Sequence, residues 1–462
     1  MSFDGWLRGN ENHATRRLGT KSGRYCALVA LASWTALTHA HGQALPPAST
    51  DSHPSASFQA SEQLMLTDLL RAVQEGAPEL AANRRAVAVA EADVRQSRLL
   101  GNPTVDGSWS TVPVGRLNPS DLNRRFANVP NYAVGVAYTF PLGKRAPRRH
   151  RAEAIARGSR AELEFETRDQ ALQLAEVLGG LATATLRREG VSELMAGGVR
   201  AAELAEARLR AQFGTGLDVD QLRIDVDRTE QLLLGANAAI LENLAACTNL
   251  VGKRCVSFHD ATSARAFLTH WLLQSDTSQV DLAQRADLQA LEAYGEAATA
   301  ERELARAQRI PDPTLRVGYL RDQFTVAGNQ LNSLNVGVSM PIPSFDYGQA
   351  QKQSAEASRR YLNEERGKRL SVARVRIPVL RQRHELSLQR CQRLSAEIIP
   401  KARAVLTNLE KAVENRLLPL TQVIQARRVV SELFIEEAQS CGDAYDAALE
   451  LVREMPSEGA TK

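Results

Sequence analysis

The chain has 462 residues, of which 24% are charged and only 5% are aromatic, and its net charge is +4. Long stretches rich in Ala, Leu, Arg, Glu and Gln are typical of long or coiled-coil helices. The small positive excess indicates no affinity for nucleic acid, and no basic stretch is interleaved with aromatic residues as in a single-strand binder. The sequence contains no phosphate-binding loop, nucleophile elbow or zinc-protease motif, and its histidines lack metal-ligand spacing. We therefore expect no enzyme, no resident metal and no cofactor.

Residues 1–40 are predicted to be a signal peptide. Basic residues precede an apolar run over 27–37, and small residues at Thr38 and Ala40 suit a signal peptidase. The alternative is an N-terminal anchor helix, but the run is too short to span about 30 Å of hydrocarbon. After residue 40 the sequence has no run of 18 apolar residues. Residues 41–65 begin with a stretch rich in Pro, Ser and Ala and are predicted to be a flexible tether.

The rest of the chain is predicted to contain two copies of one unit. Repeat 1 covers 66–250, an inter-repeat equatorial segment covers 251–284, repeat 2 covers 285–455, and a tail covers 456–462. Near-3.6 spacing of apolar residues predicts helices over 78–100, 144–213, 217–250, 284–309, 346–414 and 418–455. Alternating patterns predict strands over about 103–112, 131–140, 313–321 and 333–341.

The repeat is carried by matched glycines and prolines. Val134-Gly135-Val136 ahead of Pro141 recurs as Val336-Gly337-Val338 ahead of Pro343, at a constant offset of 202 residues. The alternative is a pair of helical hairpins that resemble each other only in composition.

Helix length favours a wall of uniform height. At 1.5 Å per residue the helices over 144–213 and 346–414 each reach roughly 105 Å. The shorter helices sum to about 85 Å and about 95 Å when joined end to end in pairs, which nearly matches the long ones. The predicted fold class is therefore mainly α with a small β part, in which long antiparallel helices form an α-barrel.

The four strand segments place apolar residues on one face and small or polar residues on the other, which suits lipid outside and water inside. A half-buried soluble hairpin shows the same alternation. Four strands cannot close a membrane barrel, because such barrels start at about 8 strands, so sister chains must complete it. The residues predicted to face lipid are Trp109, Tyr132, Val134, Val136, Tyr138, Phe140, Val317, Tyr319, Val336 and Val338.

Several of these segments resemble one family. Gly101-Asn102-Pro103-Thr104-Val105, Pro311-Asp312-Pro313-Thr314-Leu315 and Pro341-Ile342-Pro343 with Phe345-Asp346 are similar to TolC-like outer-membrane efflux proteins. The second-copy segment looks most like the outer-membrane components of heavy-metal pumps of the cobalt–zinc–cadmium or copper–silver type. The resemblance implies a homotrimer in the outer membrane, with a helical tunnel in the periplasm. It also implies a periplasmic adaptor (membrane fusion) protein and an inner-membrane pump of the resistance-nodulation-division type as partners.

The resemblance also implies that the helix turns form the tunnel tip. Tip turn 1, expected to contact the adaptor, contains Phe213, Gly214, Thr215, Gly216, Leu217 and Asp218. Tip turn 2, expected at the pore entrance, contains Glu414, Asn415, Arg416, Leu417 and Leu418. The family commonly has a Gly-containing turn in both copies, and this chain departs from that pattern at Arg416. Glu414 and Arg416 are candidates for a gating ring of charge, and a solvated helix end is the plain alternative.

Export allows disulfides, and two cysteine pairs are candidates. Cys391 and Cys441 lie 25 residues either side of position 416, so antiparallel helices would bring them to the same height. Cys247 and Cys255 are neighbours in sequence. The alternative for each pair is a set of small, unbonded core residues.

The predicted function is passive export through an outer-membrane channel of a tripartite efflux system, with heavy-metal cations as the favoured substrate. A drug-efflux or protein-secretion conduit is an alternative within the same class. A soluble periplasmic coiled-coil scaffold is the alternative from another class, and it would need no lipid-facing strands.

Overall fold

The computed structural model describes residues 57–110, 131–270, 281–322, 332–415 and 418–456. The predicted signal peptide, tether residues 41–56, Arg416 and Leu417, and tail residues 457–462 lie outside the described residues. All the elements below belong to one compact unit, Pro54–Lys462.

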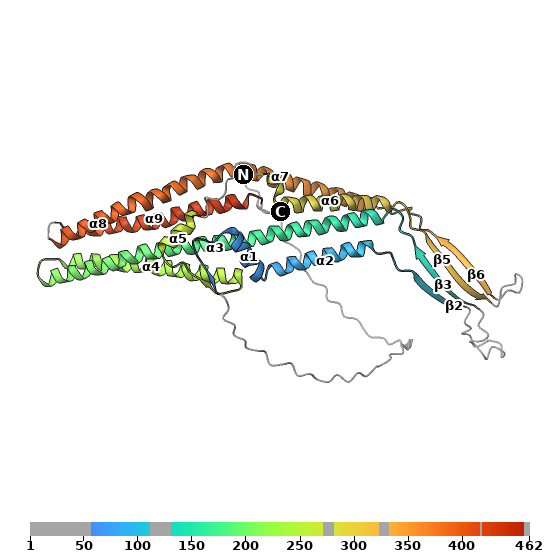
Figure 1. Cartoon of the computed structure of the whole chain (residues 1–462), viewed down its shortest axis with the longest axis horizontal. Coiled ribbons are helices and arrows are strands. Elements are labelled where there is room, and N and C mark those ends of the chain that lie inside the picture. The colour runs from blue at the N-terminus through green and yellow to red at the C-terminus, as the bar shows by residue number, and fades with distance from the viewer. Residues whose placement is uncertain (1–56, 111–130, 271–280, 323–331, 416–417, 457–462) are drawn as a thin grey trace, which may run out of the picture. The chain divides into compact units, whose positions relative to one another are not determined.

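The described residues are mainly helical (Figure 1). The helices are α1 Leu66–Gly76, α2 Leu80–Arg98, α3 Arg145–Arg210, α4 Gly216–Val251, α5 Ala261–His270, α6 Ala286–Ala307, α7 Gln349–Arg393, α8 Ile399–Glu414 and α9 Leu420–Arg453. A 3-10 turn over Leu282–Gln284 precedes α6, and a π-helical turn over Leu394–Ile398 joins α7 to α8. The strands are β1 Phe58–Gln59, β2 Thr104–Ser110, β3 Asn131–Thr139, β4 Cys255–Val256, β5 Thr314–Asp322 and β6 Asn332–Ser339. No helix among the described residues is long and apolar enough to cross a membrane.

The helices pack in a consistent order across the unit. Both α2 and α4 pack on α3, α3 packs on α6 and α9, and both of these pack on α7, while α8 packs on α9 (Figure 1). The columns formed by α2 with α4 and by α7 with α8 are therefore the two outer columns. Helix α3 has 66 residues without interruption, about 100 Å at 1.5 Å per residue, and joins the strands to the first helix turn.

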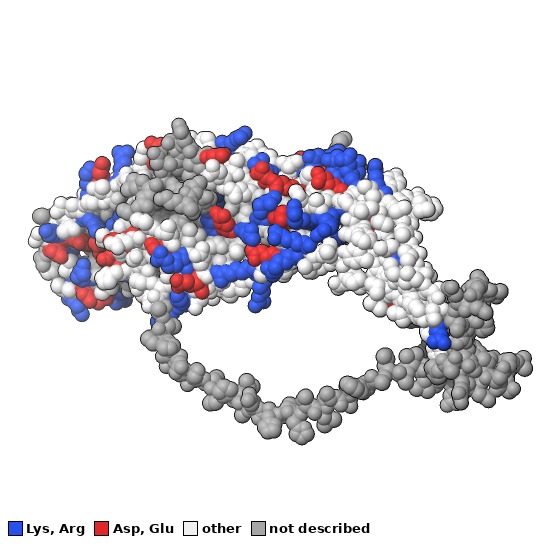
Figure 2. Space-filling view, turned by 45° about the vertical axis from the view of Figure 1, so that its right-hand side comes forward, with Lys and Arg blue, Asp and Glu red and all other residues white. Residues whose placement is uncertain are grey.

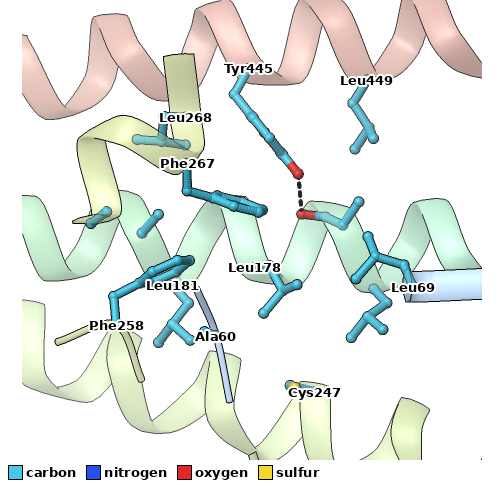
Figure 3. Packing of buried hydrophobic residues seen from close by; sticks show 14 of the residues in the cluster. Ala60, Leu69, Leu178, Leu181, Cys247, Phe258, Phe267, Leu268, Tyr445 and Leu449 are labelled. Carbon is cyan, nitrogen blue, oxygen red and sulfur yellow. Dashed lines mark hydrogen bonds between the residues drawn. The ribbon is translucent and has the colours of Figure 1, made fainter. Parts of the chain in front are cut away.

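The largest core lies midway along α3, where α1, α5 and α9 converge (Figure 3). Phe258, Phe267 and Tyr445 form a chain of ring contacts with centroids 5.1 and 5.3 Å apart. The hydroxyl of Tyr445 donates to the carbonyl oxygen of Ala175 at 2.9 Å, so this buried polar group is paired. Leu178 belongs to the same core and is fully buried.

Glycines on α3 make room for large side chains of α9. A Cβ at Gly179 would lie 2.5 Å from the ring of Tyr445, and a Cβ at Gly190 would lie 2.8 Å from the ring of Phe434. A Cβ at Gly197 would lie 2.9 Å from Arg427. The glycines are spaced by 11 and then 7 residues, and their partners on the antiparallel helix α9 have the same spacing. This glycine seam allows two long helices to approach closely around bulky residues.

The structure departs from the sequence expectations in three places. The tether assigned to 41–65 ends early, because Phe58-Gln59 pair in parallel with Cys255-Val256 and Ala60 is buried. Helices α1 and α5 were not expected, since each is a short element that gains stability only by packing into the core. The segment predicted as one helix over 346–414 is divided by the π-helical turn Leu394–Ile398, while Pro378 lies inside α7 without ending it.

Candidate functional site

The four longer strands form one antiparallel sheet in the order β2-β3-β5-β6. Its central pairing joins β3 to β5, which are far apart in sequence. The register aligns Val105, Val136, Val317 and Val336 in a single row across all four strands. Because successive residues of a strand point to opposite faces, the register assigns every side chain to one of two faces.

One face of the sheet is exposed and apolar along most of its length, and Arg321 and Asn332 lie on it where β5 ends and β6 begins. It contains each residue that the sequence predicted to face lipid, and Leu315 and Leu334 join them. Val105, Leu334 and Val338 are more than 70% exposed, and Val134 and Val136 are about half exposed. Buried side chains of this size would each be stabilised by about 1.5–3 kcal/mol, so an uncovered face of this extent indicates an interaction surface.

The other face is polar. It contains Thr104, Ser108, Thr139 and Ser339, and Arg316 on β5 forms an ion pair with Asp106 on β2. The two side chains meet above β3 at Gly135, where a Cβ would lie 3.3 Å from both of them. Glycine at this position lets the ion pair cross a strand, so the polar face is held together by side chains as well as by backbone.

Within the described residues, β2 and β6 each have one neighbour in this sheet and so leave one edge open. Open edges expose rows of unpaired N–H and C=O groups and act as templates for further strands.

Tip turn 1 lies between α3 and α4, at the end of the hairpin away from the strands (Figure 1). The reversal is made by Gln212, whose φ is +60°, whereas neither Gly214 nor Gly216 has a positive φ. Phe213 N–H donates to the Arg208 carbonyl at 2.9 Å and Gln212 N–H to the Leu209 carbonyl at 3.0 Å, which is a Schellman ending. Gly214 is needed for space, since a Cβ there would lie 3.3 Å from Arg208 and Leu209.

The next helix begins with a capping box. The Thr215 hydroxyl accepts from the backbone N–H of Asp218 at 3.2 Å, and the Asp218 carboxylate accepts from the Thr215 N–H at 3.2 Å. Thr215 is therefore the N-cap residue, and Asp218 is its reciprocal partner. Phe213 and Leu217 are 68% and 66% exposed, so two apolar side chains project from this turn, and Gly216 opens α4.

Tip turn 2 lies between α8 and α9. Glu414 and Asn415 are exposed and end α8, while Leu418 is half-buried against the apolar residues of that hairpin. Pro419 occupies the N-cap position of α9, which begins two residues later than the helix predicted over 418–455. Arg416 and Leu417, which complete the predicted pore entrance, lie outside the described residues.

A buried arginine that the sequence did not single out connects the two hairpins. Arg427 on α9 is 2% exposed, and its guanidinium lies 3.2 Å from Asp225 on α4 and 3.9 Å from Glu410 on α8. It also donates to the carbonyl oxygen of Leu194 on α3. The adjacent glycines 197 and 198 in the middle of a long helix were the one sequence signal for a bulky partner.

Both cysteine pairs named from the sequence are bonded in the structure. Cys391 at the end of α7 is joined to Cys441 on α9, with a Cα–Cα distance of 4.9 Å. With Cα atoms about 2.3 Å from each helix axis, this distance is compatible with the usual 8–10 Å between the axes of packed helices. Cys247 is joined to Cys255, which ties β4 to the end of α4.

A hollow of about 390 Å³ lies between α3, α4 and α9 and is lined by small and acidic residues. Asp446 lies at this hollow with Glu176 and Asp443. Burial, reinforced by these carboxylates, raises the pKa of Asp446 to about 6, although part of its side chain stays exposed. Across the described ranges, no group of three or more His, Cys, Asp or Glu residues could hold a metal ion.

No protein-family model and no curated protein sequence matches the chain. Solved structures do match it along most of its length. The outer-membrane channel OprN has a TM-score of 0.66 at 16% identity, over 84% of this chain and 89% of that one. CusC, described for its folding and transmembrane channel formation, has a TM-score of 0.67 at 15% identity, over 87% and 94%. The outer membrane protein VceC of Vibrio cholerae has a TM-score of 0.64 at 20% identity, over 85% and 96%.

At these identities the likeness establishes the fold. The chain has the fold of TolC-like outer-membrane channels, and the expected mainly helical architecture with a small sheet is confirmed at that level.

Proposed function

We propose that the chain is one protomer of an outer-membrane efflux channel and that it exports substrate passively. The observation that supports this most strongly is the exposed apolar face of the four-stranded sheet, with a polar face behind it. In this proposal the apolar face contacts lipid and the polar face lines a water-filled pore.

The open edges support assembly with sister chains. In hydrocarbon each unsatisfied backbone group costs several kcal/mol, so β2 and β6 must pair with strands from other copies. Three copies supply 12 strands, an even number within the range of bacterial membrane barrels. The two outer helix columns would pair in the same way and close a helical tunnel in the periplasm.

The helical end is assigned to partner contact. Phe213 and Leu217 are exposed apolar side chains at tip turn 1, and exposed apolar side chains of this kind are common at protein interfaces. We assign this turn to a periplasmic adaptor, and tip turn 2, with Glu414 and Arg416, to the pore entrance. Energy comes from an inner-membrane pump of the resistance-nodulation-division type. Heavy-metal cations are the proposed substrate, on the sequence resemblance of the second copy.

The proposal is tested by placing a charge on each face of the sheet. Arginine at a lipid-facing midplane position costs about 2–4 kcal/mol, whereas arginine facing the pore does not. Val136→Arg is therefore expected to reduce the detergent-extractable outer-membrane form strongly, while Ser108→Arg on the polar face leaves it intact. Fractionation and heat-modifiability gels measure this form, and planar bilayers measure conductance.

A wild-type chain that purifies without detergent as a monomer would overturn the proposal and favour the soluble scaffold. Equal loss in both variants would also contradict the assignment of the faces. For the substrate, we expect the channel to lower cellular copper, silver, cobalt, zinc or cadmium only when its pump is present. If the channel instead lowers the cellular content of a drug or of a secreted protein and leaves the metal content unchanged, the chain is a drug-efflux or protein-secretion conduit.

A further inference from the structure

The basic residues of the chain gather where the helices join the sheet. The four junctions cover 95–103, 140–151, 302–313 and 340–352 and contain eleven Lys and Arg against three Asp and Glu. Their net charge is therefore +8, twice the +4 of the whole chain. Figure 2 shows Lys and Arg gathered over the helices next to the nearly uncharged surface of the strands.

The junctions also carry an apolar belt. Phe140 and Leu142 are 43% and 44% exposed, Ile310 is 51% exposed, and Ile342 and Phe345 are 82% and 93% exposed. These side chains lie between the apolar face of the strands and the charged helix ends. Apolar strands, a belt of large apolar side chains and a basic collar thus follow one another along the molecule.

Some of the collar is used within the fold. Lys144 is 2.7 Å from Asp312, which ties the start of α3 to the loop before β5. Arg98 and Arg149 share the carboxylate of Glu153, at 3.2 and 3.7 Å. Of these pairs, Arg98–Glu153 joins α2 to α3, whereas Arg149–Glu153 lies within α3.

Other members of the collar have no such role. Arg145, Arg148 and Arg306 are exposed and make no side-chain hydrogen bond or ion pair within the described part of the chain. Arg145 and Arg148 lie in the first turn of α3, which contains no acidic residue. That end of a helix dipole is positive and favours acidic side chains, so helix stability does not account for two arginines there.

We infer that this basic collar binds the anionic head groups of phospholipids in the membrane leaflet nearest the helices. The inference rests on the proposed function, since it requires the sheet to lie in a bilayer. The apolar belt would occupy the boundary of the acyl chains, and arginine side chains extend from such a position to the head groups. Lysine and arginine near a membrane surface are attracted to anionic lipids, each by about fivefold in affinity.

The test compares two triple variants of the full-length chain. The collar variant is Arg145→Gln, Arg148→Gln and Arg306→Gln. The control variant is Arg200→Gln, Arg210→Gln and Arg228→Gln. It removes the same charge from exposed arginines of α3 and α4 that have no side-chain partner among residues 57–110, 131–270, 281–322, 332–415 and 418–456 and lie far from the strands. A third variant with lysine at the three collar positions keeps the charge and checks that substitution itself does not disturb the fold.

Each purified protein is titrated in detergent with fluorescent phosphatidylglycerol and, separately, with fluorescent phosphatidylcholine. The wild type, the control and the lysine variant are expected to prefer phosphatidylglycerol. The collar variant is expected to lose that preference by on the order of 100-fold, because three sites of about fivefold are removed. Excess inorganic phosphate is expected not to compete, because it lacks the acyl chains that the belt contacts.

Equal affinity of the wild type for the two lipids overturns the inference and leaves the channel proposal standing. If the collar variant keeps the wild-type preference for phosphatidylglycerol, the inference is also overturned and the channel proposal again stands. If the reversal potential of that variant in planar bilayers then differs from that of the wild type, the three arginines face the pore water. A wild-type chain that binds neither lipid and remains in aqueous buffer overturns the channel proposal itself. The two failures are therefore distinguishable.

Discussion

The glycine seam between α3 and α9 gives a sharp prediction about stability. In the middle of a helix, replacing glycine by alanine normally stabilises by about 1 kcal/mol, because glycine loses more backbone freedom on folding. Gly367 on α7 is in such a position, since a Cβ there would meet nothing within 4 Å. Gly179 on α3 is not, because its hydrogen atoms face the ring of Tyr445.

The size of the effect at Gly179 follows from two opposing terms. A Cβ would lie 2.5 and 2.6 Å from two ring carbons of Tyr445, at least about 1 Å closer than carbon atoms prefer. The ring is fully buried and its hydroxyl is bonded to Ala175, so it cannot easily move aside. Overpacking of this kind costs about 1–3 kcal/mol, and the helix term offsets about 1. We expect Gly179→Ala to destabilise by about 1 kcal/mol, opposite in sign to Gly367→Ala.

Urea unfolding of the purified chain in detergent, followed by far-UV circular dichroism, measures both variants against the wild type. Adding Tyr445→Leu should make Gly179→Ala less costly than it is in the wild-type background, with a coupling energy of roughly 1 kcal/mol. If both alanine variants gain stability equally, or if the two substitutions are additive, the seam does not pack as described.

Three further substitutions test other contacts. Arg427→Met leaves Asp225 without its buried partner and should cost about 3–5 kcal/mol by the same urea assay; a midpoint equal to the wild type would contradict it. Replacing Cys391 and Cys441 by alanine opens a 50-residue loop and should cost about 2–4 kcal/mol. A reducing agent should lower the Tm of the wild type more than that of the variant, which keeps only the Cys247–Cys255 disulfide. Asp446→Asn should raise Tm more at pH 8 than at pH 4: the raised pKa penalises the ionised folded form above about pH 6, and the penalty vanishes below the unfolded value of 3.8. Equal effects at the two pH values would contradict the raised pKa of Asp446.

The long helices and the strands could be predicted from the sequence because their signals are local. Alternation over 131–140 predicted β3 to within one residue, and apolar spacing predicted α3 over most of its length. The pairing of β3 with β5 could not be predicted, because neither strand carries a local mark of its neighbour. The sequence predicts residues 58–59 as tether, since two residues give no periodic pattern and this strand exists only through its pairing with β4.

The contacts that join distant segments could not be predicted either, because neither partner carries a local mark of the other. Arg427 has the sequence setting of an ordinary exposed arginine on an amphipathic helix, and only the fold shows it beside Asp225 and Gly198. Gln212 adopts the left-handed conformation although two glycines follow it in the same turn, because the Schellman hydrogen bonds fix the position of the reversal. The Cys391–Cys441 pair could be predicted from the sequence, since residues equally far from the turn between two antiparallel helices lie at the same height along them.

The open edges of the sheet have a consequence for how the protein must be produced. A newly made chain with two open strand edges and an uncovered apolar face is prone to aggregate in water. Its supply therefore has to stay matched to the rate at which copies meet and pair. Overproduction beyond that rate should yield insoluble material, even though each chain carries the right sequence for its fold.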